Sequence, residues 1–315
     1  MLETFLNVLG QMMIVLILLL VGYIFNRKKL TPTATETVLP KLVTQLFLPA
    51  LTLNTFLTRC TVENLQLYGP FVLYGGIVSV AMVALSYPIS RLMSPKDSYQ
   101  AGVVRYCVSF PNTGAVAVPL VIAMFGTLGN FQLSLFLLVN SILTYSWGIA
   151  QLVPPEGQRK TFWQKIRGLL NPVFICMIIG GVLGVTGVAA KLPTFLYDGL
   201  DRVGTCYTVS ALFLTGYIIA DYKPKEIFGD KRVYIMTALR LIILPAIVLA
   251  VMKLLHVSDL LMKIACLYVV CPCGMNTVVY PAAYRRDSRF GASLVLTSSA
   301  LSVITVPLIY ALMTA

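Results

Sequence analysis

The sequence predicts an all-α polytopic membrane protein, and three observations carry that prediction. Of the 315 residues, 58% are hydrophobic and only 11% are charged, and the mean hydropathy is +0.84. The apolar residues form long continuous runs, unlike the alternating strands of an outer-membrane barrel. A spanning helix needs about 20 mostly apolar residues, so the chain has room for ten. The composition excludes a soluble enzyme, a disordered regulator and a disulfide-stapled secreted domain.

Ten apolar segments are predicted to cross the bilayer, with short connections between them. The expected spans are residues 5–25, 36–57, 66–92, 99–125, 131–152, 169–190, 196–220, 232–255, 260–285 and 290–313. The first span is expected to be a membrane helix and not a signal peptide, because no basic segment precedes it and no small-residue cleavage site follows it. The longest connection mixes Phe162 and Trp163 with basic residues, which is typical of either an interfacial helix or a plain basic loop.

Basic residues gather at alternate ends of these spans, and cytoplasmic loops favour Lys and Arg. One side receives 18 of the 24 Lys and Arg residues. They are Arg27, Lys28, Lys29, Lys41, Arg91, Lys96, Arg105, Arg159, Lys160, Lys165, Arg167, Lys223, Lys225, Lys231, Arg232, Arg285, Arg286 and Arg289. This bias predicts a multi-pass protein of the cell membrane with both termini extracellular or periplasmic. The net charge of +12 then reflects cytoplasmic loops and not nucleic-acid binding.

Two of the spans are interrupted by helix-breaking residues at corresponding places. The fourth span contains Val-Ser-Phe-Pro-Asn-Thr-Gly-Ala-Val-Ala-Val-Pro over residues 108–119. The ninth contains Val-Cys-Pro-Cys-Gly-Met-Asn-Thr-Val-Val-Tyr-Pro over residues 270–281. The lead prolines, Pro111 and Pro272, are 161 residues apart, about half the chain.

The spacing of these breaks divides the chain into two five-helix repeats. The first repeat covers residues 1–153, a cytoplasmic loop with the possible interfacial helix covers 154–168, and the second repeat covers 169–315. Because five is odd, the two repeats have opposite orientations in the membrane. Inverted repeats of this kind are characteristic of secondary transporters.

A broken helix within a membrane indicates a binding site, because lipid cannot satisfy the backbone groups that proline frees. The amides that begin the second half-helix favour an anion. Each lead proline lies about 12 residues into its span, which at 1.5 Å per residue places the breaks near the midplane. The alternative is that the prolines merely kink packed helices, as expected for Pro49, Pro88, Pro245 and Pro307. The predicted substrate-binding residues are Asn112, Asn276, Pro111, Pro272, Gly114, Gly274, Asn140 and Gln45.

These motifs carry a resemblance that covers essentially the whole chain. Phe-Pro-Asn-x-Gly at 110–114 with Val-Pro-Leu at 118–120, the Asn171-Pro172 pair, and Pro272…Asn276…Pro-Ala-Ala-Tyr-Arg-Arg-Asp ending at residue 287 resemble the auxin efflux carrier family. That family includes plant PIN-formed auxin transporters and bacterial carriers of malate or malonate, and it is related to the bile acid–sodium symporters.

The resemblance implies ten helices in two inverted repeats, with helices four and nine broken and crossing at proline. It also implies a scaffold part and a transport part that move relative to each other, often in a homodimer. The crossover prolines carry over to Pro111 and Pro272, and the substrate-facing asparagines to Asn112 and Asn276. The long central loop of the best-known plant members is absent, which favours a compact bacterial-type carrier. Cys271 and Cys273, which flank Pro272, depart from the family pattern.

Charged and thiol side chains within the spans offer few other candidates. All acidic residues lie in loops or near span ends, which disfavours proton coupling through a buried carboxylate. Arg240 is the one cation well inside a span. It is expected either to snorkel to the surface or bond to a neighbouring helix carbonyl, or else to serve as a counter-charge for an anion. The Cys-Pro-Cys sequence resembles the copper motif of heavy-metal ATPases, but no loop could hold their nucleotide domains, so packing cysteines are preferred.

The sequence therefore predicts a secondary transporter for a small organic anion, auxin-like or a mono- or dicarboxylate. No nucleophile motif, phosphate-binding loop or paired metal ligands are present, so neither an enzyme nor a cofactor is expected. The expected partners are the organic anion, the lipid bilayer and a second copy of the chain. One alternative is a sodium-coupled symporter of the bile-acid type, in which carbonyls at the breaks coordinate Na⁺. Another is a channel or receptor that senses its ligand without moving it.

Overall fold

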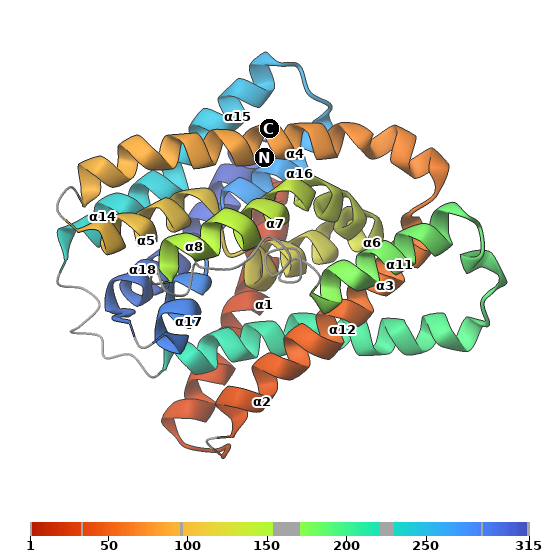
Figure 1. Ribbon diagram of the computed structural model, residues 1–315, viewed down its shortest axis with the longest axis horizontal. Coiled ribbons are helices and arrows are strands. Elements are labelled where there is room, and N and C mark those ends of the chain that lie inside the picture. The colour runs from red at the N-terminus through yellow and green to blue at the C-terminus, as the bar shows by residue number, and fades with distance from the viewer. Residues whose placement is uncertain are drawn as a thin grey trace.

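The computed structural model describes residues 2–32, 34–94, 97–153, 171–220, 230–284 and 286–313. Within these ranges the ordered elements are helices, and the only β-type pairing is an isolated bridge. The predicted all-α class is thereby confirmed, and Figure 1 shows the helices crossing one another at various angles. The interfacial helix considered for residues 154–168 lies outside the described residues.

The N-terminal part of the chain follows the predicted segments closely. Its elements are α1 (Leu2–Arg27), α2 (Thr35–Leu42), η1 (Val43–Phe47), α3 (Leu48–Arg59), α4 (Val62–Met93), α5 (Ser98–Ser109), η2 (Thr113–Ala117), α6 (Val118–Phe136), α7 (Leu138–Leu143), η3 (Thr144–Gly148) and α8 (Ile149–Leu152). Within α6, Gly126 has φ of 63° and ψ of −157°, so a kink separates the predicted fourth and fifth spans there.

The C-terminal part begins at α11 (Pro172–Val185). It continues with η4 (Ala189–Lys191), α12 (Thr194–Ile219), α14 (Lys231–Ala238), η5 (Leu239–Ile243), α15 (Leu244–Leu254), α16 (Asp259–Val269), α17 (Asn276–Ala283) and α18 (Arg289–Met313). Across the described residues, four helical stretches are long and apolar enough to cross a membrane: Val62–Met93, Thr113–Phe136, Lys231–Leu254 and Arg289–Leu312. The total of ten spans and their inverted-repeat arrangement stay predictions.

Prolines inside the helices have two different local effects. The π-helical turns η1, η2 and η5 each end two residues before a proline, at Pro49, Pro119 and Pro245. Proline lacks an amide hydrogen and its ring clashes with the carbonyl four residues earlier, and a widened turn relieves both problems. Pro88 and Pro307 lie within α4 and α18 without such a turn. The π-turns matter because they carry Thr44, Thr113 and Arg240.

The helices pack into two groups. The first group, here called the flanking bundle, consists of α1, α2, η1, α3, α11 and α12, which contact one another extensively. The second, the crossing bundle, contains α4 to α8 and α14 to α18 with their π-turns. In Figure 1, α3 and α11 lie together on the right, whereas α5, α14, α17 and α18 lie on the left. Contacts of α1 with α18, of α3 with α6 and of α12 with η2 join the two bundles.

Glycine allows the closest helix contact in the flanking bundle. A Cβ added to Gly22 of α1 would lie 2.0 Å from the Phe213 carbonyl oxygen, and one added to Gly216 of α12 would lie 1.9 Å from that of Leu19. Real Cβ atoms cannot approach so closely, so these backbones touch only because both positions are glycine. Small residues at helix interfaces are typical of membrane proteins, in which packing and not water exclusion holds helices together.

Candidate functional site

The first helix interruption separates α5 from η2. The helix α5 ends at Ser109, and Phe110 is extended, with φ of −127° and ψ of 99°. At Asn112 the backbone has φ of −77° and ψ of 66°, the geometry of an inverse γ-turn. The Thr113 amide closes that turn by donating to the Pro111 carbonyl at 2.8 Å. The predicted break at Pro111 is therefore confirmed.

The second interruption separates α16 from α17. The helix α16 ends at Val269, and helical structure resumes only at Asn276. The Cys273 amide, freed from the helix, donates to the Ser298 hydroxyl of α18 at 3.0 Å. Thr277 in turn donates its hydroxyl to the Gly274 carbonyl at 2.9 Å. Side chains of the protein thus satisfy backbone groups that lipid could not.

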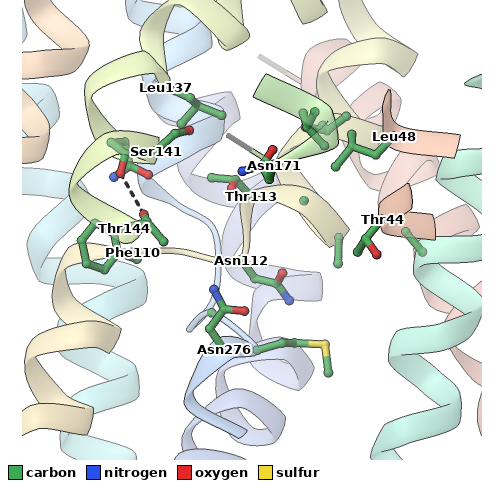
Figure 2. Close-up of a pocket in the computed structure, with 18 of the residues that line it drawn as sticks. Thr44, Leu48, Phe110, Asn112, Thr113, Leu137, Ser141, Thr144, Asn171 and Asn276 are labelled. Atoms are coloured by element: carbon green, nitrogen blue, oxygen red, sulfur yellow. Dashed lines mark hydrogen bonds between the residues drawn. The ribbon is translucent and has the colours of Figure 1, made fainter. Parts of the chain in front are cut away.

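The two interruptions lie against each other. An isolated antiparallel bridge pairs Pro111 with Cys273, and the Asn112 amide donates to the Pro272 carbonyl at 2.8 Å. Gly274 permits this approach, because a Cβ there would lie 2.8 Å from the Phe110 carbonyl oxygen. A backbone hydrogen bond thereby joins two segments that are about half a chain apart in the sequence. Figure 2 shows Asn112 and Asn276 side by side at this point.

A cavity of about 400 Å³ opens beside the interruptions, at the boundary between the two bundles. The crossing bundle contributes Tyr106, Phe110, Pro111, Asn112, Thr113, Gly114, Ala115, Val118, Asn130, Ser134, Leu137, Leu138, Asn140, Ser141, Ile142, Thr144, Tyr145, Gly274, Met275 and Asn276. The flanking bundle contributes Val43, Thr44, Leu48, Thr52, Asn171, Val173, Phe174, Met177, Tyr207, Ala211, Leu214 and Thr215. Among the described residues, the lining carries amides, hydroxyls and apolar groups but no Asp, Glu, Lys, Arg or His.

The two predicted asparagines differ in how their side chains are held. Asn112 is 8% exposed, and its side-chain nitrogen, Nδ2, finds no hydrogen-bond partner within the described part of the chain. The Nδ2 of Asn276 donates to the Tyr106 hydroxyl at 2.6 Å, which fixes the amide's position. A buried donor without a partner is costly, so Asn112 has a donor that an acceptor group in the cavity could use.

Three other lining groups are held by contacts with distant residues. The Gly114 carbonyl accepts a hydrogen bond from the Tyr207 hydroxyl of α12, which brings the flanking bundle to the first interruption. Asn140 donates to the Tyr268 hydroxyl at 2.7 Å, linking α7 to α16. Asn171, in the predicted Asn-Pro pair, caps α11 by accepting from the Phe174 amide at 2.9 Å. Figure 2 shows Asn171 and Thr113 on one side of Asn112 and Asn276.

The structure brings most of the predicted site residues together. Asn112, Asn276, Pro111, Gly114, Gly274 and Asn140 all line the cavity. Pro272 lies behind it, buried, and contributes its carbonyl to the crossing. Gln45 is exposed and outside the lining, and its neighbour Thr44 lines the cavity instead.

Several lining residues were missed by the sequence interpretation. In the sequence, Tyr106 and Tyr207 are indistinguishable from aromatic residues that only pack in a membrane helix. Their hydrogen bonds to Asn276 and to the Gly114 carbonyl show that they hold groups of the cavity lining. Asn130 was also overlooked, although a polar amide in an apolar segment is a usable signal. It donates to the Thr55 hydroxyl at 2.9 Å and so connects α6 with α3.

The remaining candidates from the sequence lie outside the cavity lining. Arg240 is fully buried and bonds to main-chain carbonyls, so it does not snorkel to the surface. Cys271 and Cys273 are buried free thiols. Within the described ranges, no group of three or more His, Cys, Asp or Glu side chains is arranged to hold a metal.

Comparison with known proteins identifies the family of the chain. No curated protein matches the chain. A family model described as "Membrane transport protein" matches residues 7–310, nearly the whole sequence. The chain therefore belongs to this membrane transport protein family, the family of the auxin efflux carriers.

Proposed function

We propose that this membrane transporter is a secondary carrier for a small organic anion with one carboxylate. One observation carries the proposal: a cavity of about 400 Å³, whose described lining is uncharged, lies where two interrupted helices meet, and it holds a buried amide donor that has no partner among the described residues. The volume is within the range of small-molecule sites. Asn112 would donate to the carboxylate, with Asn276 beside it.

Helix dipoles supply the positive potential that the lining side chains lack. The half-helices that begin at Thr113 and Asn276 both start at the cavity. Each helix N-terminus behaves as about +0.5 elementary charge, so two together approximate the single charge of a monocarboxylate. The amides of Gly114 and Ala115, in the first turn of η2, find no backbone acceptor among the described residues. These amides can donate to an anion without a lysine or arginine in the site.

A neutral lining also suits transport energetically. A carrier must release its substrate, and binding weak enough to reverse is easier to obtain from dipoles than from a buried full charge. Since no acid or base lines the described cavity, the bound anion would move with its own charge. An inside-negative potential of 100 mV then favours its outward movement by about 2.3 kcal/mol, more than tenfold in concentration ratio.

Alternating access would follow from the division into two bundles. The cavity lies between them, so a movement of the crossing bundle against the flanking bundle would expose it to one side and then the other. We assign the role of transport part to the crossing bundle and the role of scaffold to the flanking bundle. We further propose ten spans in two inverted repeats, residues 1–153 and 169–315, with the breaks near the midplane, both termini outside the cell and a homodimeric assembly.

Counterflow in liposomes tests the proposal. Purified protein is reconstituted in vesicles preloaded with one carboxylate of a panel, and uptake of the same labelled carboxylate is followed. We expect saturable counterflow for at least one monocarboxylate, and its loss in both Asn112→Ala and Asn276→Ala. Asn64→Ala is the control, because Asn64 contacts the Arg59 carbonyl at the α3–α4 connection, outside the cavity. Unsaturable flux would indicate a channel, and unchanged uptake in both variants would show that the site is elsewhere.

A further inference from the structure

A single arginine connects the two interruptions on the side away from the cavity. Arg240 is 0% exposed. Its Nε donates to the Cys271 carbonyl at 3.1 Å, just beyond the end of α16, and its Nη1 donates to the Val108 carbonyl at 3.3 Å, in the last turn of α5. The remaining nitrogen, Nη2, finds no acceptor within the described residues, and no carboxylate there forms an ion pair with this guanidinium.

Helix dipoles explain how the buried charge is tolerated. The half-helices α5 and α16 both end at the crossing, and each C-terminus behaves as about −0.5 elementary charge. Two such ends facing each other repel, but together they match the single positive charge of one guanidinium. Without that match, burial of the full charge would be strongly unfavourable. Arg240 and the two helix ends therefore form a neutral unit.

The position of Arg240 depends on its local sequence. It lies in the π-turn η5, which precedes Pro245. The planar guanidinium carries five donors in a fixed fork, so one side chain can reach carbonyls of two different elements, whereas a lysine offers a single point charge. Carbonyl oxygens at helix breaks are also the groups with which secondary transporters bind Na⁺.

We propose that Arg240 is a built-in counter-cation: its guanidinium occupies the carbonyl site at the back of the crossing, and an inorganic cation is excluded from it. Arg240 is thus a positioning residue that holds both interruptions in place without sodium. As a consequence that rests on the proposed function, transport of the organic anion proceeds without sodium coupling.

The test measures thermal unfolding of the purified full-length protein, so it needs neither a substrate nor transport. The midpoint is compared in 150 mM NaCl and 150 mM choline chloride for the wild type and for Arg240→Ala, Arg240→Gln and Arg240→Lys. The wild type and Arg240→Lys should melt at the same temperature in both salts. Arg240→Ala and Arg240→Gln expose the two carbonyls, so Na⁺ should raise their midpoints by at least about 2 °C. Arg59→Gln is the matched control, because Arg59 bonds to the Thr127 hydroxyl away from the crossing.

A sodium-dependent midpoint in the wild type would overturn the proposal, because the carbonyl site would then accept Na⁺ despite Arg240. The proposal would also be overturned if the neutral variants, Arg240→Ala and Arg240→Gln, folded but showed no sodium response. An Arg59→Gln control that responded to sodium as strongly as these two variants would overturn it as well. If the neutral variants do not fold in choline but fold in NaCl, the proposal is supported; if they fold in neither salt, the wild-type and Arg240→Lys comparison decides. Failure of counterflow in the preceding experiment would leave these outcomes unaffected, so the two proposals can fail separately.

Discussion

At the scale of single residues, the candidate site depends on side chains that hold one another. The Asn276 amide donates to the Tyr106 hydroxyl at 2.6 Å, and Tyr106 is 2% exposed. This contact orients one predicted substrate amide before any ligand arrives. The Asn112 amide nitrogen, in contrast, has no partner in the described residues. The site thus combines one fixed amide with one whose donor is available.

Tyr106→Phe should weaken substrate binding without unfolding the protein. Loss of the hydroxyl leaves the Asn276 amide without its anchor, at a cost of about 0.5–1.5 kcal/mol, or roughly 2- to 13-fold in Kd. Saturation of counterflow in liposomes gives the half-saturating concentration. Tyr217→Phe is the control, because that hydroxyl accepts from Thr31 away from the cavity. An equal effect of both substitutions would mean that Tyr106 acts only through general packing.

At the scale of elements, the breaks were predictable and their partners were not. Proline, asparagine and glycine clustered within a few residues are local signals, so Pro111 and Pro272 could be assigned from the sequence alone. The contact between Tyr106 and Asn276 joins residues 170 positions apart, and that between Tyr207 and Gly114 joins residues 93 apart. No periodicity encodes such pairs. Gln45 is polar and therefore an expected site residue, but its equally polar neighbour Thr44 lines the cavity instead, and polarity alone does not distinguish the two.

The contact between α1 and α12 gives a stability prediction. Gly216→Ala places a methyl group 1.9 Å from the Leu19 carbonyl oxygen, so the helices must separate, at a cost of about 1–3 kcal/mol. The melting temperature in detergent should fall accordingly. Gly199→Ala on the same helix is the matched control, because a Cβ there meets nothing within 4 Å, and it should raise stability by about 0.5–1 kcal/mol. A Gly216→Ala protein as stable as the control would contradict the close packing.

At the scale of the whole molecule, the cavity belongs to neither bundle alone. The flanking bundle contributes Thr44, Asn171 and Tyr207 to its lining, and the crossing bundle contributes both interruptions. Charge and spacing in the sequence predict two repeats, which stay a prediction, but they do not indicate which helices pack together, because that depends on long-range contacts such as the Thr55–Asn130 hydrogen bond. Movement between the bundles is the step that would convert a binding site into a carrier.

Cross-linking of the bundles should stop transport and leave binding intact. Arg59 and Thr127 lie on opposite bundles and outside the cavity lining, with the Arg59 Nη2 3.0 Å from the Thr127 Oγ1. In a chain whose exposed Cys206 and half-buried Cys176 are replaced by serine, Arg59→Cys with Thr127→Cys should be joined by a short, reducible, thiol-specific cross-linker. Counterflow should cease and return on reduction, while the carboxylate still raises the melting temperature. Either single cysteine variant treated in the same way is the control, and full counterflow in the cross-linked protein would rule out relative movement of the bundles.

The central claim is that an anion binds beside Asn112 and Asn276, and a charge of the same sign placed there tests it most directly. Asn112→Asp and Asn276→Asp keep the size of each side chain, and Asn64→Asp at the α3–α4 connection is the control. Two negative charges about 4 Å apart repel by about 4 kcal/mol at an effective dielectric constant of 20, roughly 1000-fold in affinity. Counterflow of the carboxylate at pH 8 should therefore be lost in both site variants and kept in the control. Undiminished counterflow in folded Asn112→Asp and Asn276→Asp proteins would contradict the account.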